Sequence, residues 1–269
     1  PHVVARTEAR GTGSMSTDFS FDDRIVHLYN QQRAHPPHVS QAIGDAIAQR
    51  AGTRPVLEMG IGTGRIAKPI AQAGARVVGF DLSPQMLGEA ANALSVTQAD
   101  MHHMPYRADS FGIVIAVHVL HLADAWQTVL AEIARVLQRD GVFIQGNDWV
   151  DPQSVFGRLR NELRMHAVRL DPALMPPAAG ISKADVLQQL GATHSEEVIV
   201  AEWEQTMSAN DRLAMIEQRL DNESWILSDA IFDKMLVHLR DFAGKIWSDL
   251  DEKQTVKRRF IMKITYGDW

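Results

Sequence analysis

One glycine-rich stretch, VLEMGIGTGRIA at residues 56–67, constrains the fold more strongly than any other part of the sequence. Its first four residues, Val56–Met59, are mostly apolar and predict a short buried strand. Three glycines follow and predict a tight turn, because glycine adopts backbone angles that a Cβ atom forbids. They are Gly60, Gly62 and Gly64. Residues 65–73 then predict a helix, whose first N–H groups have no partner within the helix. A strand, a glycine-rich turn and a helix form the first unit of a nucleotide-binding α/β fold.

The spacing of these glycines bears on which ligand the turn holds. Dinucleotide folds use G-x-G-x-x-G, whereas this turn reads G-x-G-x-G, and the chain has no G-x-x-x-x-G-K-[ST] phosphate loop. Glu58 precedes the turn and adds a carboxylate that would repel a phosphate. The resulting E-x-G-x-G-x-G pattern resembles motif I of class I S-adenosylmethionine-dependent methyltransferases. The resemblance implies that Glu58 and the three glycines bind S-adenosyl-L-methionine, with an ordinary glycine-rich loop as the alternative.

Composition argues against several classes of partner. The net charge of −6 argues against a nucleic-acid ligand, which usually requires a basic face. The chain has no cysteine, which removes disulfides, thiolate nucleophiles and zinc–cysteine sites and fits a cytoplasmic location. No apolar run approaches the roughly 18 residues of a membrane helix, so no membrane partner is expected. At 269 residues the chain suits one large domain or one domain with a cap.

The N-terminal region predicts two parts. Residues 1–14 are polar and lack periodicity, so we expect a tail outside the fold, either disordered or an added extension. Residues 15–50 predict two helices separated by a Pro-Pro pair. The leading helix resembles the N-terminal gate over the cofactor in small-molecule methyltransferases. That resemblance implies cofactor contacts from Tyr29 and Arg33, and a surface pair near a turn is the alternative.

An acidic residue ends the second predicted strand, residues 76–82. Asp81 lies seventeen residues after the last glycine of the turn, close to the ~20 expected of a ribose-binding acid. Its two carboxylate oxygens can accept from both ribose hydroxyls, whereas a plain turn residue is the alternative. The family resemblance extends the predicted cofactor site to Leu82 and Met86.

A second acid follows the third predicted strand, residues 95–99. Asp100 and Met101 occupy positions that resemble the adenine-binding residues of methyltransferases. The resemblance implies that the Asp100 carboxylate accepts from the adenine amino group and that the Met101 backbone N–H donates to the ring. An aspartate that caps a loop is the alternative.

Two histidines follow the fourth predicted strand, residues 111–117, whose apolar run is typical of a strand buried on both faces. Imidazole titrates near neutral pH, so His118 or His121 is a candidate general base, with His118 also beside the cofactor. Packing or a polar pocket wall is the alternative. We expect no metal site. A strand order of 3-2-1-4-5 would separate His102 and His103 from His118 and His121 by three strand spacings, about 14 Å at ~4.8 Å each, which is too far for one metal ion to bind both pairs.

Beyond residue 147 the pattern changes to long helices interrupted by two strands. In methyltransferases the last two strands form an antiparallel hairpin at the sheet edge, and here a helical insertion separates them. We expect a cofactor-binding core over 51–147, a cap insertion over 148–181, a core helix and strand over 182–207, a helical cap over 208–255 and the last core strand over 256–269.

The two insertions are predicted to cover the cofactor edge of the sheet, because excursions of ~30–50 residues are unusually long for connections. Five tryptophans lie in this half of the chain: Trp149, Trp203, Trp225, Trp247 and Trp269. Aromatic walls suit an apolar or aromatic small-molecule acceptor. The alternative is that these side chains pack the cap helices onto the sheet.

Together these features predict an α/β fold with a doubly wound, mostly parallel seven-stranded sheet of the Rossmann-like methyltransferase type, carrying helical caps. The predicted function is S-adenosylmethionine-dependent transfer of a methyl group to a small acceptor by in-line displacement. Two alternatives stay open. One is an NAD(P)-dependent oxidoreductase, which the glycine spacing and Glu58 disfavour. The other is a non-catalytic S-adenosylmethionine-binding module.

Overall fold

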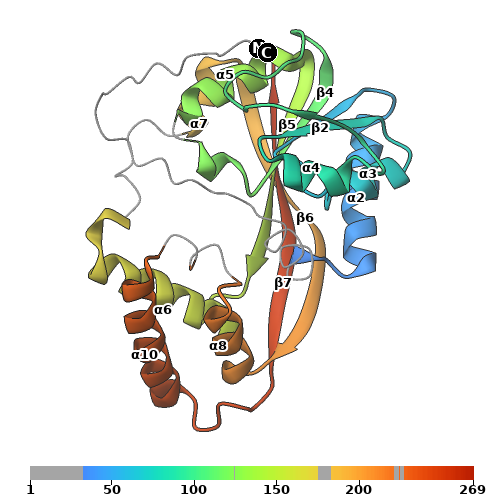
Figure 1. Ribbon diagram of the computed structural model, residues 1–269. Coiled ribbons are helices and arrows are strands. Elements are labelled where there is room, and N and C mark those ends of the chain that lie inside the picture. The colour runs from blue at the N-terminus through green and yellow to red at the C-terminus, as the bar shows by residue number, and fades with distance from the viewer. Residues whose placement is uncertain (1–32, 124, 175–182, 221–223, 225–226) are drawn as a thin grey trace, which may run out of the picture.

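The computed structural model describes residues 33–123, 125–174, 183–220, 224 and 227–269. A seven-stranded sheet flanked by helices forms the core, and a helical lobe lies beyond one end of the sheet (Figure 1). The strand order is β3-β2-β1-β4-β5-β7-β6. The first five strands are parallel, and β7 runs antiparallel between β5 and the edge strand β6. The predicted doubly wound, mostly parallel sheet and its antiparallel edge are confirmed.

The strands predicted over 76–82, 95–99 and 111–117 are present to within one residue, and the first of the two helices predicted over 15–50 lies largely outside the described residues. The strands are β1 (Val56–Met59), β2 (Val77–Asp81), β3 (Ser95–Gln98), β4 (Phe111–Val117), β5 (Leu137–Val150), β6 (Ala192–Met207) and β7 (Gln254–Gly267). The helices are α2 (Pro37–Ala51), α3 (Ala67–Gln72), α4 (Pro84–Ala90), α5 (Trp126–Val136), α6 (Val155–Leu170), α7 (Lys183–Gln189), α8 (Ala209–Glu217) and α10 (Asp229–Ile246). β5 extends beyond residue 147, where the cofactor-binding core is predicted to end. It continues to Val150 because β7 pairs with it along that length.

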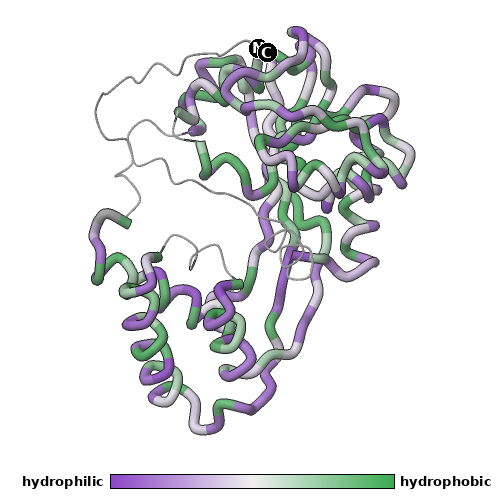
Figure 2. Tube along the Cα trace, in the orientation of Figure 1, coloured by the Kyte–Doolittle hydropathy of each residue, from purple (hydrophilic) through white to green (hydrophobic). Residues whose placement is uncertain are grey.

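Two layers of helices cover the sheet, because alternate strand residues face opposite sides. On one face, Ile43 and Ile47 of α2 and Ile70 of α3 pack against the central strands. On the other face, Leu130 and Ile133 of α5 pack against residues such as Leu57 and Val114, and α7 joins them. Every residue of β4 is buried, as expected of a central parallel strand. Figure 2 shows the apolar residues concentrated in this core and inside the helical lobe.

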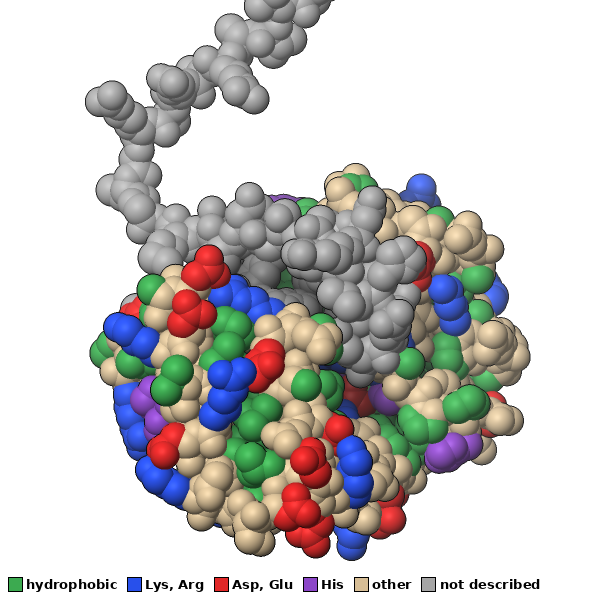
Figure 3. Space-filling view, turned by 60° about the horizontal axis from the view of Figure 1, so that its bottom comes forward, with side chains coloured by type: hydrophobic (Ala, Val, Ile, Leu, Met, Phe, Trp, Pro, Cys, Tyr) green, Lys and Arg blue, Asp and Glu red, His purple; other side chains and the backbone are tan. Residues whose placement is uncertain are grey.

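The lobe has its own hydrophobic core. Helices α6, α8 and α10 pack together through a cluster that includes Leu159, Leu213 and Leu239, all nearly fully buried. Because β5 leads directly into α6, the lobe lies beyond the carboxyl ends of the parallel strands (Figure 1). Its surface carries interspersed acidic and basic side chains in the view of Figure 3. In the described part of the chain, no helix is both long and apolar enough to span a membrane.

Candidate functional site

The glycine-rich turn between β1 and α3 has the backbone that its sequence requires. Gly60, Gly62 and Gly64 have φ values of 62°, 55° and 82°, a region that side chains with a Cβ atom rarely adopt. A Cβ atom on Gly60 would also overlap the side chain of Val119. One on Gly62 would lie 3.2 Å from Cε of the buried Met86. The turn is therefore both conformationally special and tightly packed.

Asp81 ends β2 beside this turn. Its Oδ2 accepts a hydrogen bond from the Gly62 N–H at 2.9 Å, and its Oδ1 accepts one from the Ser83 N–H at 2.9 Å. Each carboxylate oxygen has a second lone pair, so Asp81 can fix the turn and still accept from a ligand. The next residue, Leu82, is 67% exposed and leaves an apolar surface beside these acceptors.

Glu58 lies buried in β1 beneath the turn, with 3% of its surface exposed. Burial raises its pKa to about 8, although Arg65 and a hydrogen bond from the Ala67 N–H oppose that rise. Its Oε2 has no hydrogen-bond partner among the described residues. The sequence predicts a negatively charged Glu58 that repels phosphate. A pKa of about 8 instead favours the protonated carboxyl group at neutral pH in the ligand-free chain. The case against a dinucleotide therefore depends on the glycine spacing.

Asp100 follows β3 and is the third acid at this edge of the sheet. Its Oδ1 accepts from the His102 N–H at 2.9 Å and lies 2.7 Å from His102 Nδ1. These interactions lower the pKa of Asp100, so the side chain stays ionised. Its side chain is 51% exposed and Met101 is half-buried, so this part of the edge is accessible to a ligand.

A buried cluster around Asp148 is the part of the site that sequence reasoning missed. Asp148 belongs to β5 rather than to the predicted cap insertion. His118 Nε2 lies 3.0 Å from its Oδ2, and His35 Nε2 lies 2.6 Å from its Oδ1. Arg65 Nη1 lies 3.3 Å from Oδ2 and also contacts the His35 ring. Burial alone would raise the pKa of Asp148, but hydrogen bonds from both histidines and the charge of Arg65 hold it well below its usual range.

The structure separates the two candidate bases. His118 has a φ of 53°, so the chain turns sharply after β4 and directs the imidazole at Asp148. A left-handed backbone in a residue other than glycine costs on the order of 1 kcal/mol, and such strain is frequent at functional sites. His121 lies exposed in a short 3₁₀ turn, Leu120–Leu122. Sequence reasoning could not choose between them, whereas the contact with Asp148 favours His118.

The prediction that the histidines form no metal site depends on the strand order. The order of the parallel strands is confirmed as 3-2-1-4-5. Among the described residues, no group of three or more histidine or acidic side chains is placed to hold a metal ion.

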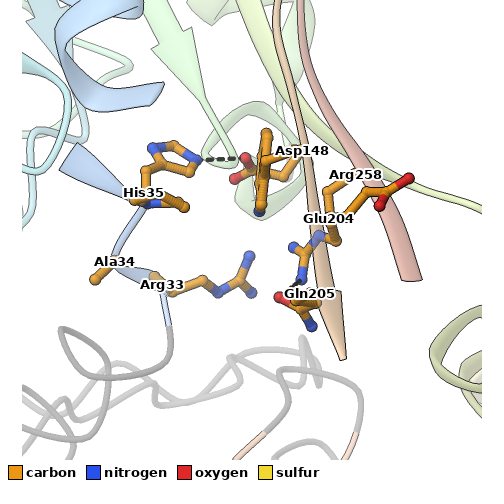
Figure 4. Close-up of a pocket in the computed structure, with 9 residues that line it drawn as sticks. Arg33, Ala34, His35, Asp148, Glu204, Gln205 and Arg258 are labelled. Carbon is orange, nitrogen blue, oxygen red and sulfur yellow. Dashed lines mark hydrogen bonds and ion pairs between the residues drawn. The ribbon is translucent and has the colours of Figure 1, made fainter. Parts of the chain in front are cut away.

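A cavity of about 320 Å³ lies beside Asp148 (Figure 4). Arg33, His35 and Asp148 line it from one side, and Trp203, Gln205 and Arg258 line it from the other. Arg33 therefore lies at this cavity, and Tyr29, its predicted partner in the gate, lies outside the described residues.

The predicted aromatic residues are dispersed rather than gathered at one pocket. Trp203 lines the cavity and contacts the His35 ring edge-on, with 5.5 Å between the two ring centroids. Trp149 lies beneath Arg259, Trp247 packs in the helical lobe, and Trp269 packs on the core. Trp225 lies outside the described residues.

Comparison with known families identifies the core. Residues 57–145 match the family described as "Methyltransferase domain". An uncharacterised protein of Mycobacterium tuberculosis is 30% identical over 156 residues, which cover 55% of this chain and 56% of that protein. An uncharacterised methyltransferase of Bacillus subtilis is 32% identical over 130 residues, covering 45% of this chain and 54% of that protein. The matches thus span about half the length of these curated relatives.

Solved structures support the fold. The YcgJ protein of Bacillus subtilis has a TM-score of 0.53 and 18% identity, covering 84% of this chain and 98% of that one. Phosphoethanolamine N-methyltransferase 2 of Haemonchus contortus, solved with phosphomonomethylethanolamine and S-adenosylhomocysteine, has a TM-score of 0.53 and 14% identity. That match covers 93% of this chain and 58% of the Haemonchus protein. At these identities the likeness establishes the shared fold.

Proposed function

We propose that this chain, whose residues 57–145 form a methyltransferase domain of the class I S-adenosylmethionine-dependent type, transfers a methyl group from S-adenosylmethionine to a small-molecule acceptor. The observation that carries the proposal is the order of groups along one sheet edge. The glycine turn, Asp81, Asp100 and His118 follow β1, β2, β3 and β4 in turn. Ligands of open α/β sheets bind at this carboxyl edge.

The residues present fit S-adenosylmethionine. Asp81 offers lone pairs for two ribose hydroxyls, and the exposed Leu82 offers an apolar surface beside them. Glu58 holds a buried oxygen without a partner in the described chain, and a positively charged ligand beside it would favour the ionised carboxylate. Asp100 is ionised and accessible, as an acceptor for an adenine amino group must be.

The bound cofactor supplies a methyl group on a sulfonium, which is already electrophilic. The chain must therefore position the acceptor, exclude water and take up a proton. His118 is the proposed base. Its Nε2–H donates to Asp148, which leaves Nδ1 to accept a proton from the acceptor nucleophile. Asp148 stays ionised and acts as a positioning residue that holds this tautomer. A base with an orienting carboxylate favours an enzyme over a non-catalytic binding module.

The proposed acceptor site is the cavity beside Asp148. Its volume of about 320 Å³ suits a small molecule. The sequence-based preference for an aromatic or apolar acceptor retains one supporting contact, the Trp203 wall. Most of the remaining lining is polar or charged, so we expect the acceptor to carry polar groups as well.

Cofactor binding gives the direct test of this function. Asp81→Ala removes both acceptors for the ribose and releases the Gly62 N–H. Hydrogen bonds to a charged group are worth ~1.5–3 kcal/mol, so the affinity for S-adenosylhomocysteine should fall at least tenfold in calorimetry. NAD and ATP should give no signal with the unmodified chain.

Two controls make the Asp81 result specific. Asp233→Ala removes an exposed carboxylate from α10 in the lobe and should leave S-adenosylhomocysteine affinity unchanged. Thermal unfolding should verify that Asp81→Ala is folded. An unchanged affinity in a folded Asp81→Ala variant would contradict the ribose assignment, and tight NAD binding would favour an oxidoreductase.

We also propose that the helical lobe closes over the acceptor and excludes water from the reaction. Hydrogen exchange can measure this. S-adenosylhomocysteine together with an acceptor found by methylation screening should protect backbone amides of α6, α8 and α10 more than S-adenosylhomocysteine alone. If protection is confined to residues 33–147, the acceptor binds elsewhere and the lobe has a purely structural role.

A further inference from the structure

The cavity beside Asp148 is lined by arginine from two directions. Arg33 precedes α2, and Arg258 lies in β7, the strand between β5 and β6. Figure 4 shows their guanidinium groups pointing toward one another across the cavity. Arg258 is paired in register with Trp203 on β6 and lies over that ring, with its Cζ 5.6 Å from the ring centroid.

The acidic residues of the neighbouring strand do not neutralise Arg258. Side chains alternate along β6, so Trp203 and Gln205 face the cavity while Glu202 and Glu204 face outward. Glu204 also lines the cavity, but its carboxylate points away from the guanidinium groups in Figure 4. Glu202 instead forms an ion pair with Arg259 at 2.6 Å.

Asp148 is the carboxylate that faces the cavity, and its bonding capacity is largely used. Both of its oxygens bind histidine nitrogens, and Arg65 lies within 3.3 Å of one of them. Arg258 Nη1 meanwhile donates a long hydrogen bond of 3.4 Å to Gln205 Oε1. Its Nε has no partner in the described ranges of the chain.

Further positive charge lies behind the cavity wall. Arg160, Arg212 and Arg258 all contact the ring of Phe156, with Cζ to centroid distances of 5.7, 4.0 and 5.3 Å. Burial lowers the pKa of Arg258, and the charges of Arg160, Arg33 and Arg212 lower it further against the opposing effect of Asp148. A largely buried guanidinium is expensive to maintain unless an anion pairs with it.

We propose that Arg33 and Arg258 form an oxyanion subsite that binds a carboxylate or phosphomonoester group of the methyl acceptor. This assignment of the acceptor's chemical class rests on the proposed methyltransferase function, whereas anion binding itself does not. Two forked guanidinium groups match the geometry of an oxyanion, and Trp203 supplies an apolar surface for the rest of the molecule. The subsite adjoins Asp148, whose Oδ2 binds the ring of the proposed base His118.

The test uses calorimetry with three probes that share one ring: phenyl phosphate, benzoate and phenol. Phenyl phosphate and benzoate should bind the unmodified full chain, and their relative affinities decide between a tetrahedral and a planar oxyanion. Phenol should not bind measurably. Arg258→Gln should weaken anion binding at least tenfold, because it removes one charged donor group. Arg33→Gln acts from the opposite wall and should have the same effect, which keeps the test valid if Arg258→Gln folds poorly.

Arg259→Gln is the matched control. Arg259 is the adjacent residue on the same strand, but it pairs with Glu202 and lies over Trp149 rather than lining the cavity. Its replacement should leave anion affinity unchanged. Equal losses in Arg258→Gln and Arg259→Gln, or no anion binding by the unmodified chain, would overturn the proposal. S-adenosylhomocysteine affinity is measured in parallel, so that failure of the methyltransferase assignment is distinguished from failure of the anion subsite.

Discussion

Replacing His118 by alanine should lower the turnover number of methyl transfer by about 10²–10⁴, the usual contribution of a general base. The expectation follows from the bond between His118 Nε2 and Asp148, which fixes the ring with Nδ1 available for proton uptake. The acid limb of the pH–rate profile should flatten at the same time. Steady-state rates over a pH series, with an acceptor found by screening, measure both effects.

Control variants separate a base from a packing residue. His118→Asn keeps an N–H donor for Asp148 but cannot take up a proton, so it should be as inactive as His118→Ala. His121→Ala removes the exposed histidine of the same segment and should leave rate and profile unchanged. Rescue of the rate by His118→Asn would mean that His118 only holds Asp148 in place. Full activity of both substitutions at His118 would exclude a base there.

The cofactor half of the site could be predicted because its signals are local. Gly60, Gly62 and Asp81 lie at the ends of strands whose apolar pattern is readable, and Asp100 follows a short, mostly polar strand. Parallel strands bring such ends to one edge of the sheet. The position of Glu58, two residues before Gly60, was equally predictable from the sequence, but its protonation state was not. Burial decides that property, and burial comes from packing α2 and α3 over β1.

The acceptor half could not be predicted because its contacts join distant segments. His35 and Asp148 are 113 residues apart, and Arg258 reaches the same cavity only because β7 inserts between β5 and β6. Asp148 was assigned to an insertion because residues 146–149 lose the apolar pattern of the strand. The one available signal was an aspartate near the end of the fifth parallel strand, the position that carries an acid in β2.

The protonation of Glu58 predicts an unusual pH dependence of stability. Its pKa is about 8 in the folded chain against 4.5 in the unfolded one. Between these values the unfolded chain gives up a proton that the folded chain keeps, so the free energy of unfolding falls as pH rises. At about 1.4 kcal/mol per pH unit and a pKa difference of about 3.5, the full loss above pH 8 is on the order of 5 kcal/mol. That is a large part of the ~5–15 kcal/mol that stabilises a typical domain. Asp148 has a lowered pKa, so its contribution is lost only as pH falls below about 4, outside this window.

Glu58→Gln removes this titration while keeping a neutral side chain of the same shape. Below about pH 4 the variant and the unmodified chain should have similar stability, because Glu58 is then mostly protonated in both the folded and the unfolded chain. At pH 8 the variant should be more stable, by on the order of 4 kcal/mol, in urea unfolding of the ligand-free chain. Glu252→Gln, at an exposed position before β7, should show no such divergence. A constant difference between Glu58→Gln and the unmodified chain from pH 5 to pH 8 would mean that Glu58 titrates normally. In that case Glu58 would be a fixed negative charge beneath the glycine turn, and its electrostatic repulsion of phosphate would again separate this turn from a dinucleotide site.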